Sequence, residues 1–589
     1  MARANLKGAL GAEKVKQFGG ICHGGSKNGS GREEGSFNAY DICNFRILPD
    51  GSLEKRDGFS PIMTLPGEAR AFWSGYLDGD EMSFALIGST VYGIDLENGG
   101  AQILGSVLSS EGRAEFFFYR GMLYLVDGLD FYRYDGSDFE SFAGYVPLYG
   151  KNWNGEYGCE VYEPVNFLSD RIRIHYKLSG LINRFYTGIE CSEILSFICN
   201  GVDYMDSVTL SADGTKITVS VFLPDDGEID VCLALMPSHY RRSELMGVTR
   251  GTVYGGADDG RILLYGGSDA SKLFASREVS HSSYLESLAA DASSCEVYFP
   301  VTDTVSVTDG RYPITALCRH YDRLLIFTER ETWMADFTKG DAELYIVPIN
   351  SGVGCLSENG AVLGGNSPYT VSEGGIYRWT SEDDERNECN AVCISGEIGD
   401  MLDESFFAHA SAFYLRSRGE VWFADPDSED QEVFIYSIPG GKWYRFDGIP
   451  VDMFFSYGDR VCMLYGKYIF AFSEDDLEDT SAEGAVHSNI EAYYESNLTD
   501  FGYPERTKHL GRVLVKAECD GDPFSVTVTG DMGGSKTIEV KENGSENGKY
   551  PTYFDAHSGI GRFREMNYII RSDSLGRTRI MSLTLSALK

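Results

Sequence analysis

The sequence predicts an all-β fold: a β-propeller with an inserted β-sandwich domain and a C-terminal β-sandwich domain. The chain has 589 residues, more than one hydrophobic core can organise, so several domains are expected. Aromatic residues make up 13% of the chain and glycines number 68. Aromatic side chains fit half-buried pleated surfaces, and glycine allows tight turns between short strands. A strand pattern that returns at roughly 40 to 60 residues, the period of propeller blades, completes the prediction.

The repeated unit is a short apolar strand, a polar turn, a second strand ending near Tyr-Leu or Phe, and another turn at Asp or Gly. Alternation at every second residue between such turns is typical of an antiparallel meander. Neighbouring blades bury each other's faces around a ring, so residues 36–146 and 251–474 are predicted to form one propeller. Clear units occupy residues 116–136, 314–337, 367–379, 413–448 and 451–472.

The repeat stops near Pro147, and residues 147–250 are predicted to form the inserted sandwich. Alternating segments at 171–178, 207–223 and 229–235 supply its strands, and Ala-Asp213-Gly-Thr gives a strong hairpin signal. After this domain, the stretch around Asp269 is expected to open a loop, with a short helix at residues 284–290.

Two terminal regions complete the predicted organisation. Residues 1–35 are glycine-rich and lean basic, which indicates a polar N-terminal arm. Residues 475–486 are acidic and small, so they are expected to be a linker. Residues 487–589 contain further strand patterns, including 525–534 and 579–588, and are predicted to form the C-terminal β domain.

The formal charge of −38 argues against a protein that grips nucleic acid. It comes from 89 acidic and 51 basic residues, whereas tight DNA binding needs a surplus of Lys and Arg to displace counterions from phosphates. The charge fits a solvated acidic surface, and it fits a wall that lets DNA slide past without sticking. The two interpretations are compatible.

The thirteen cysteines are scattered singly and are expected to be reduced core residues. No CxxC pair occurs, and the closest pairs, Cys389/Cys393 and Cys191/Cys199, lack a second nearby Cys/His pair for zinc. The first residues have no apolar signal-peptide region, and no apolar run is long enough for a membrane anchor. The expectation is synthesis in a reducing cytoplasm.

The sequence nominates no catalytic, cofactor-binding or metal-binding residue, which predicts a protein that is not an enzyme. The nine histidines are dispersed, with no HExxH motif and no GxSxG nucleophile elbow. The turn at Asp213 resembles a sialidase Asp-box but lacks the aromatic residue that follows it. Residues 425–430 offer carboxylates for calcium but lack the turn glycine of an EF-hand loop, so an exposed turn is the preferred interpretation. Arg241, Arg242 and Arg319 are isolated and are expected to be salt-bridge partners.

One N-terminal phrase resembles a known family. Asp41, Asn44 and Arg46 are followed by Asp50-Gly51 and then by a short return strand that ends at Arg56-Asp-Gly58. This arrangement resembles the opening of the tail nozzle, or tail tubular, proteins of short-tailed bacteriophages, which are β-propeller virion proteins. Similar matches to that family's loops and strand entrances lie at residues 267–274, 314–337, 354–379 and 499–508.

The resemblance implies a structural protein of the virion tail that assembles into a ring of six subunits below the tail adaptor ring. Its partners would be its own copies, the adaptor ring, and tail-fibre or tail-tip proteins. Double-stranded DNA would pass through the ring during genome ejection without specific binding. Six chains of −38 carry about −230 formal charges, and an acidic channel would repel phosphates. The arm at residues 1–35 would reach a neighbouring subunit or ring.

Two other functions stay open at this point. A tail-tip or host-attachment protein would use the inserted sandwich to bind a host glycan or membrane protein, and a trimer would favour it. A carbohydrate-active propeller enzyme would need paired carboxylates or an arginine cluster, and turnover on glycans would reveal it.

Overall fold

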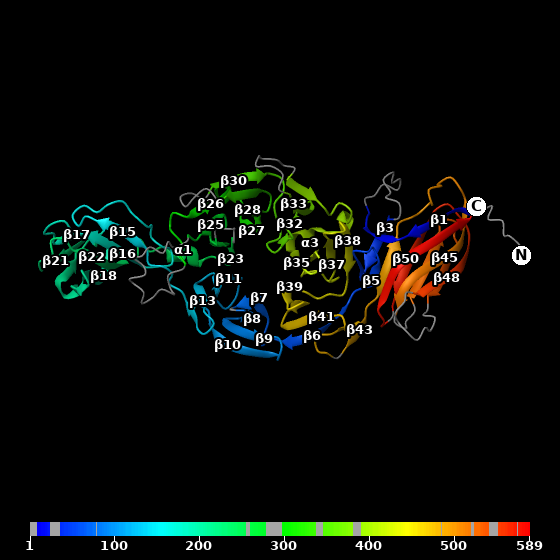
Figure 1. The fold of residues 1–589 in the computed structure, drawn as a ribbon, viewed down its shortest axis with the longest axis horizontal. Coiled ribbons are helices and arrows are strands. Elements are labelled where there is room, and N and C mark those ends of the chain that lie inside the picture. Colours follow the sequence, from blue (N-terminus) through cyan, green and yellow to red (C-terminus); the bar gives the residue numbers. More distant parts are fainter. Residues whose placement is uncertain are drawn as a thin grey trace, which may run out of the picture.

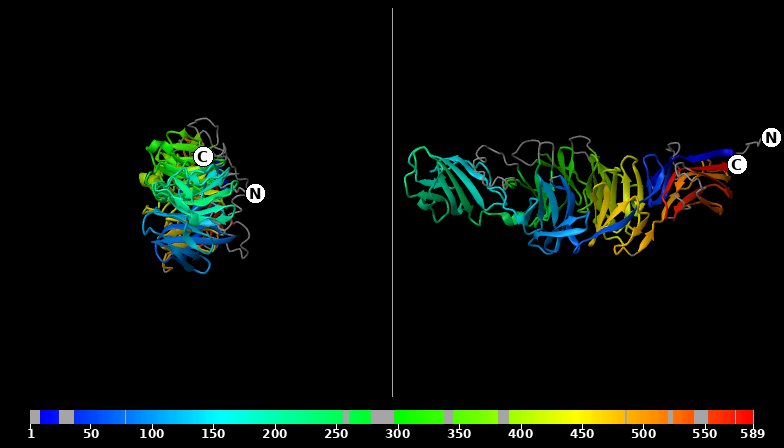
Figure 2. Two further views of the ribbon diagram at one scale, coloured as in Figure 1. Left: turned by 90° about the vertical axis from the view of Figure 1, so that its left-hand side faces the viewer. Right: turned by 60° about the horizontal axis from the view of Figure 1, so that its bottom comes forward.

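The protein is an all-β chain with many four-stranded antiparallel sheets in a propeller-like arrangement. The computed structural model describes residues 9–23, 36–77, 79–254, 260–277, 297–336, 345–380, 390–484, 486–519, 524–540, 552–573 and 575–588. The molecule is elongated, with a central ring of sheets and one further β unit at each end (Figures 1 and 2). Within the described residues, no helix is long and apolar enough to cross a membrane.

Within the residues that the structure describes, seven groups of four strands form the ring. Six are separate sheets, and the seventh consists of four consecutive strands at the end of a ten-stranded sheet. The first four groups contain β7 (Ala69–Leu77), β8 (Asp80–Ile87), β9 (Thr90–Asp95), β10 (Gly100–Ser106); β11 (Glu115–Tyr119), β12 (Met122–Val126), β13 (Phe131–Tyr134), β14 (Phe139–Ser141); β23 (Arg250–Val253), β24 (Ile262–Tyr265), β25 (Lys272–Ala275), β26 (Thr304–Ser306); and β27 (Ile314–His320), β28 (Arg323–Thr328), β29 (Thr332–Asp336), β30 (Tyr345–Asn350). The other three contain β31 (Ala361–Gly364), β32 (Ser367–Ser372), β33 (Gly375–Trp379), β34 (Ala391–Cys393); β35 (Ser411–Leu415), β36 (Glu420–Ala424), β37 (Val433–Ser437), β38 (Lys442–Phe446); and β39 (Met453–Tyr457), β40 (Arg460–Tyr465), β41 (Tyr468–Ser473), β6 (Gly58–Thr64).

The ring closes between its two chain ends. Strand β6, from the N-terminal part of the chain, pairs antiparallel with β41, whose sheet is otherwise built from residues about 400 positions later. Strand β39 of this last sheet also contacts β7 of the first sheet. Backbone hydrogen bonds and side-chain packing therefore join the beginning of the ring to its end.

Aromatic and aliphatic side chains fill the spaces between neighbouring sheets. Phe72 of the first sheet and Phe455 of the last lie with ring centroids 4.6 Å apart, and Phe84 lies 5.3 Å from Tyr134 of the second sheet. Leu263 and Leu324 share the apolar cluster between the third and fourth sheets. Fully burying a side chain of this size contributes about 1.5–3 kcal/mol, so the ring is held mainly by these contacts between sheets.

The unit between β14 and β23 contains two sheets over one apolar core. The five-stranded sheet consists of β15 (Leu148–Trp153), β16 (Arg171–Lys177), β22 (Glu228–Leu235), β18 (Cys191–Cys199) and β19 (Val202–Asp203). The three-stranded sheet consists of β17 (Arg184–Tyr186), β21 (Lys216–Val219) and β20 (Val208–Leu210). Trp153, Tyr176 and Phe185 are fully buried between them. The predicted Asp213 hairpin connects β20 and β21.

The unit at the other end combines both termini of the chain. One sheet orders β4 (Phe45–Ile47), β5 (Leu53–Lys55), β50 (Thr578–Leu588), β45 (Lys508–Cys519) and β48 (Thr552–Phe563), with β1 (Ala9–Val15) on β50. The other continues from β38 through β3 (Ser36–Cys43), β44 (Ala492–Ser496), β49 (Met566–Ser572), β46 (Phe524–Gly530) and β47 (Ser535–Val540), with β2 (Gln17–Ile21) on β3. One apolar core runs from this unit into the sixth sheet of the ring.

The structure differs from the predicted division at the N-terminus. The predicted arm, residues 1–35, contributes β1 and β2, and residues 36–57, predicted as propeller, contribute β3, β4 and β5 to the C-terminal unit. The physical reason is that strand edges offer unpaired N–H and C=O groups, which a strand from anywhere in the chain can satisfy. A pairing partner more than 550 residues away leaves no local signal.

Smaller differences from the prediction concern where single elements begin and end. The predicted linker, residues 475–486, contains β42 (Glu478–Thr480), which pairs with β43 (His487–Asn489). The loop expected around Asp269 ends at once in strand β25. The inserted unit also ends before residue 250, where β23 begins the third ring sheet. The helix predicted at residues 284–290 lies outside the described residues.

Candidate functional site

A cluster of charged side chains crosses the interior of the ring. Arg113 and Glu115 lie at the start of β11, Arg250 begins β23, and Glu358 and Asn359 precede β31. Strands β11 and β23 contact each other, whereas β31 contacts β27 and β35, so these residues come from two separate parts of the ring. The same strand positions form the inner edge of the ring, and the cluster therefore spans its axis.

The axial cluster combines ion pairs with hydrogen bonds to neutral groups. Arg113 pairs with the carboxylate of Glu358 and donates to Asn359 Oδ1 at 2.6 Å. Arg250 donates to the Glu358 carboxylate at 3.2 Å, to its backbone oxygen at 2.7 Å, and to Glu115 Oε2 at 3.4 Å. Burial, followed by the charge of Arg250, lowers the pKa of Arg113. The cluster fastens opposite sides of the ring together by charge-assisted hydrogen bonds.

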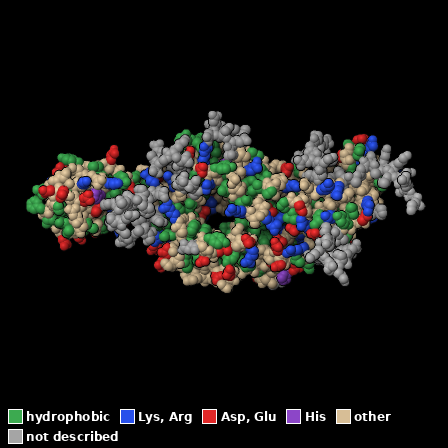
Figure 3. Space-filling model, in the orientation of Figure 1, with side chains coloured by type: hydrophobic (Ala, Val, Ile, Leu, Met, Phe, Trp, Pro, Cys, Tyr) green, Lys and Arg blue, Asp and Glu red, His purple; other side chains and the backbone are tan. Residues whose placement is uncertain are grey.

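The space-filling view shows a hollow at the centre of the ring, with Lys and Arg side chains around it (Figure 3). The axial cluster explains why this hollow is not a wide passage, because the Arg113 and Arg250 side chains reach across the interior to Glu358. These contacts narrow the interior of the ring.

A second polar cluster joins the C-terminal unit to the ring. It contains residues of the N-terminal sequence motif that begins at Asp41. Asn44 is 1% exposed, and its φ of 55° is a left-handed conformation that asparagine tolerates. The Asn44 amide donates to Glu491 O at 2.8 Å and to the Asp447 carboxylate, and its Oδ1 accepts from Asp447 N at 3.1 Å. The Asn44 side chain therefore connects β3 and β4 to the segment that follows β38.

Two arginines extend this junction cluster. Arg56 donates to Asn44 Oδ1 at 2.9 Å and makes a two-pronged ion pair with Asp479, at 2.8 and 2.5 Å. Arg46 lies 3.3 Å from Glu420 Oε1 and places its guanidinium 5.4 Å from the centre of the Phe446 ring. Burial raises the pKa of Asp479, and the hydrogen bond and charge of Arg56 oppose that shift. These residues of the N-terminal motif therefore lock the C-terminal unit to the ring.

A third contact of this kind lies at the outer side of the junction. Arg445 on β38 donates to both carboxylate oxygens of Asp41 on β3, at 3.1 and 2.8 Å, and to Tyr493 on β44 at 2.7 Å. Burial raises the pKa of Asp41, but the hydrogen bond and charge of Arg445 outweigh burial, so the pKa lies below its ordinary value. Strand pairing between β3 and β38 covers one residue pair, and these side chains reinforce it.

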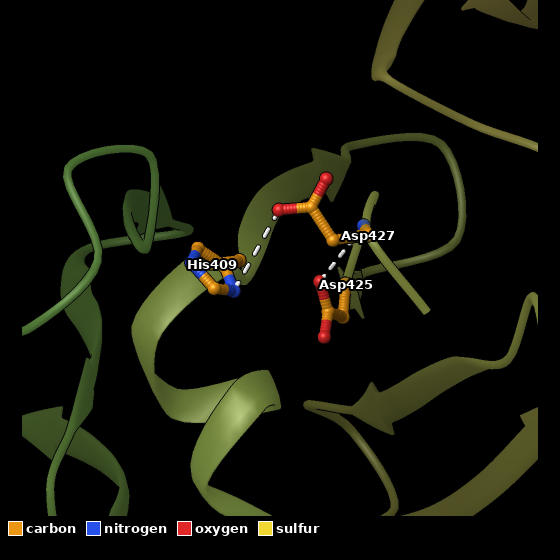
Figure 4. Close-up of side chains that lie close together, drawn as sticks. All are labelled: His409, Asp425 and Asp427. Carbon is orange, nitrogen blue, oxygen red and sulfur yellow. Dashed lines mark hydrogen bonds and ion pairs between the residues drawn. The ribbon is translucent and has the colours of Figure 1, made fainter. Parts of the chain in front are cut away.

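The possible metal ligands of residues 425–430 acquire a partner in the folded chain. Within the part of the chain that the structure describes, one group of three His, Cys, Asp or Glu residues could hold a metal ion: His409, Asp425 and Asp427. His409 ends the short helix α3 (Glu404–His409), and the two aspartates lie in the turn after β36 (Figure 4). The sequence alone points to the aspartates and not to the histidine, because nothing in it indicates where α3 packs.

The other residues weighed from the sequence have structural contacts. Asp213 accepts from Ser211 Oγ at 2.5 Å and from Thr215 N at 3.2 Å within its hairpin. Arg241 pairs with Glu244, and Arg242 pairs with Asp130, both at 2.6 Å. Arg319 donates to the backbone oxygen of Tyr321 at 2.7 Å.

The described cysteines are free thiols, most of them buried. Cys191 and Cys199 stand at the two ends of β18. Cys389 lies outside the described residues. Burial raises the pKa of the thiols of Cys191, Cys318, Cys355 and Cys462 to about 12.

No protein-family model and no curated protein matches the chain. Among solved structures, the chain has distant similarity to PorZ, described as an essential surface component of the type-IX secretion system of Porphyromonas gingivalis, with a TM-score of 0.34 and 10% identity. That alignment covers 84% of this chain and 46% of the PorZ chain, so the chain spans about half the length of that protein. The CNH domain of AfRom2 gives a TM-score of 0.34 and 6% identity, covering 71% of this chain and 99% of that domain. These similarities are distant and assign no family.

Proposed function

We propose that the chain is a structural component of a bacteriophage tail, a nozzle-like subunit whose copies form a ring around the distal DNA channel. In this proposal the seven groups of strands are the blades of a β-propeller, with a β-sandwich inserted between the second and third blades and a C-terminal β-sandwich. The protein would assemble with its own copies and would bind the tail adaptor ring and the tail-fibre or tail-tip proteins. Its charge of −38 would keep it from specific contact with DNA.

The observation that carries this proposal is the elongated shape of the chain, in which the axial cluster crosses the interior of the ring (Figure 2). Because Arg113 and Arg250 tie opposite sides of the ring together through Glu358, the genome channel of this proposal would lie between chains rather than within one. An elongated subunit with a β unit at each end suits such an assembly, since its long side can line a shared lumen while its ends contact other rings (Figure 2). The lock formed by Asn44 and Arg56 joins the C-terminal unit to the ring.

A basic groove on the C-terminal unit is the surface we assign to contact with an acidic neighbour. Lys14 on β1 and Lys516 on β45 lie on the same sheet, with Lys16 just beyond β1, and these lysines line a groove beside Tyr553. Tyr553 is 61% exposed, and its ring lies 5.9 Å from Lys516 Nζ. On a chain of −38, such a groove complements the acidic surface of another copy.

This groove also revises the role expected for the N-terminal arm. Strand β1 pairs with β50 of its own chain along most of its length, so residues 9–15 support the groove from within the same subunit. Deleting the arm would remove two strands from the C-terminal unit and would no longer test assembly alone. Charge reversal at Lys14 and Lys516 is the sharper change, because it leaves the strands in place.

The test is the mass and symmetry of the purified full chain, by mass photometry and negative-stain class averages, alone and with the adaptor protein. Rings with a central hole support the proposal, and Lys14→Glu combined with Lys516→Glu should reduce ring formation. Lys467→Glu, at an exposed lysine in the turn between β40 and β41, is the control and should assemble normally. A monomer or trimer that never forms rings in either condition would overturn the proposal.

One observation favours host attachment as a second candidate function. The inserted unit is anchored near the ring by Asn166, which bridges Pro300, so the loops after β16 and β21 lie at its far end. These loops expose Leu181 and Phe222, at 70% and 90%. An exposed apolar tip is a common feature of protein or membrane contact sites. A trimeric chain that binds host cells, and loses binding on Phe222→Ser, would support this function over the ring.

A further inference from the structure

We propose that His409, Asp425 and Asp427 form a binding site for one first-row divalent transition-metal ion. The ligand atoms of the three side chains all lie within 4.8 Å of one another. His409 comes from the end of α3 and the aspartates come from the turn between β36 and β37, and the close-up shows the side chains gathered in one place (Figure 4). The site is independent of the proposed tail function.

The spacing of His409 and Asp427 fits shared coordination better than a hydrogen bond. His409 Nδ1 and Asp427 Oδ2 are 3.7 Å apart, which is longer than the range of about 2.7–3.2 Å for an N–H···O hydrogen bond. Two ligands each about 2.1 Å from a tetrahedrally coordinated ion are separated by about 3.4 Å. A small movement of these side chains, which are 51% and 71% exposed, would therefore bring both atoms onto one ion.

The Asp425 side chain is held in place by hydrogen bonds. Asp425 is 6% exposed, and its carboxylate accepts from Asp427 N at 2.9 Å and from Ser405 Oγ at 3.0 Å. Ser405 also lies 3.4 Å from His409 Nδ1, so the serine holds the helix and the turn in register. Each Asp425 oxygen keeps a further lone pair after accepting one hydrogen bond, which leaves this side chain able to bind a cation.

The surroundings of the site are negative. Among the described residues, the ion pair found for Asp427 is with His409, and neither aspartate has a Lys or Arg nitrogen within 4.0 Å. Carboxylates placed together without a Lys or Arg partner repel one another, and a divalent ion would relieve that repulsion.

The ligand set selects the class of ion. Calcium and magnesium prefer oxygen ligands alone, whereas imidazole combined with carboxylates suits manganese, zinc and their first-row neighbours. Three protein ligands leave the remaining coordination positions to water, since His409 and Asp427 face solvent. The bound ion would fasten α3 to the turn after β36 and stabilise this edge of the sixth ring sheet.

Mn²⁺ is the probe for the test, because the thirteen cysteines of the chain would compete for Zn²⁺. Titration of the full chain with Mn²⁺, followed by the loss of the free-ion EPR signal, should give one bound ion per chain. Loss of an outer partner of a metal ligand already weakens binding by about 10-fold to 100-fold, so His409→Ala and Asp427→Asn should each weaken it at least about 10-fold. Mn²⁺ should also raise the thermal unfolding temperature of the unchanged chain and of a His487→Ala control, but not of His409→Ala.

The matched control is His487→Ala. His487 Nδ1 lies 3.6 Å from Glu478 Oε2, a comparable pair on the surface without a third ligand. This variant should bind Mn²⁺ as the unchanged chain does. Equal binding by His409→Ala, Asp427→Asn and the unchanged chain would overturn the proposal, as would the absence of any bound ion. His409 and Asp427 are exposed, so neither substitution is expected to prevent folding.

Discussion

Replacing Arg56 by methionine should weaken the junction between the ring and the C-terminal unit strongly. The Arg56 side chain is 2% exposed and that of Asp479 is 12% exposed, so the substitution leaves a carboxylate buried without its partner. Removing one partner of a buried ion pair typically costs about 3–5 kcal/mol. At about 2–4 °C per kcal/mol for a unit of 150–250 residues, the unfolding temperature of the C-terminal unit should fall by about 6–20 °C.

The assay is calorimetric unfolding of the full chain, in which the C-terminal transition is identified by limited proteolysis at intermediate temperatures. Arg512→Met is the matched control, because Arg512 pairs with Asp555 through two contacts but the side chains are 55% and 43% exposed. An exposed pair contributes about 0–1 kcal/mol. Equal shifts for Arg56→Met and Arg512→Met would refute the reasoning that burial makes the junction pair important.

The stability cost of Arg56→Met should also depend on pH. Burial already raises the pKa of Asp479, and Arg56 opposes that shift, so Arg56→Met should raise the pKa further. A carboxyl group whose pKa is higher in the folded state gives a stability contribution that is present at low pH and is lost as pH rises through the folded pKa. The cost of Arg56→Met should therefore be larger at pH 8 than at pH 5. Adding Asp479→Asn should recover much of the loss at pH 8 and remove this pH dependence.

Three further predictions concern other parts of the chain. At pH 8, a brief exposure to iodoacetamide should modify the exposed Cys393 and spare Cys355, whose pKa burial raises to about 12; peptide mass mapping checks this, and equal labelling would contradict it. Gly214→Ala should lower the unfolding temperature of the inserted unit, because φ is 68° and the added Cβ would lie 2.2 Å from Cys191 O. Gly99→Ala, with φ of 70° and open space around it, should show the backbone strain alone, about 1–3 kcal/mol, and a loss as large as that of Gly214→Ala would contradict the steric argument. Arg250→Met should cost about 1–3 kcal/mol and speed hydrogen exchange at the start of β31, measured by mass spectrometry, whereas unchanged exchange would show that the axial cluster does not fasten the ring.

The local pattern of the sequence was sufficient for strands and for their immediate partners. Alternation and turn residues predicted an antiparallel meander of three strands in residues 413–448, because side-chain direction alternates along a strand and a short turn brings the next strand beside it. The meander forms there with four strands, β35 to β38. The hairpin at Asp213 was predicted for the same reason. The candidate metal site could be predicted only in part. The carboxylates at 425–430 stand out in the sequence, whereas nothing in the sequence indicates that His409 lies beside them.

Long-range pairing and side-chain convergence were decided by the tertiary structure. Strand β6 completes the last ring sheet, and β1 joins β50, because any open strand edge accepts hydrogen bonds whatever the distance along the chain. Arg56 meets Asp479 and His409 meets Asp427 because packing brings their elements together. The sequence by itself determined that the chain is built from short antiparallel strands and carries a large negative charge. Which edges meet, which charges are buried as pairs and whether the ring is open along its axis depend on the packed fold, since these contacts follow from shape and burial rather than from neighbouring residues.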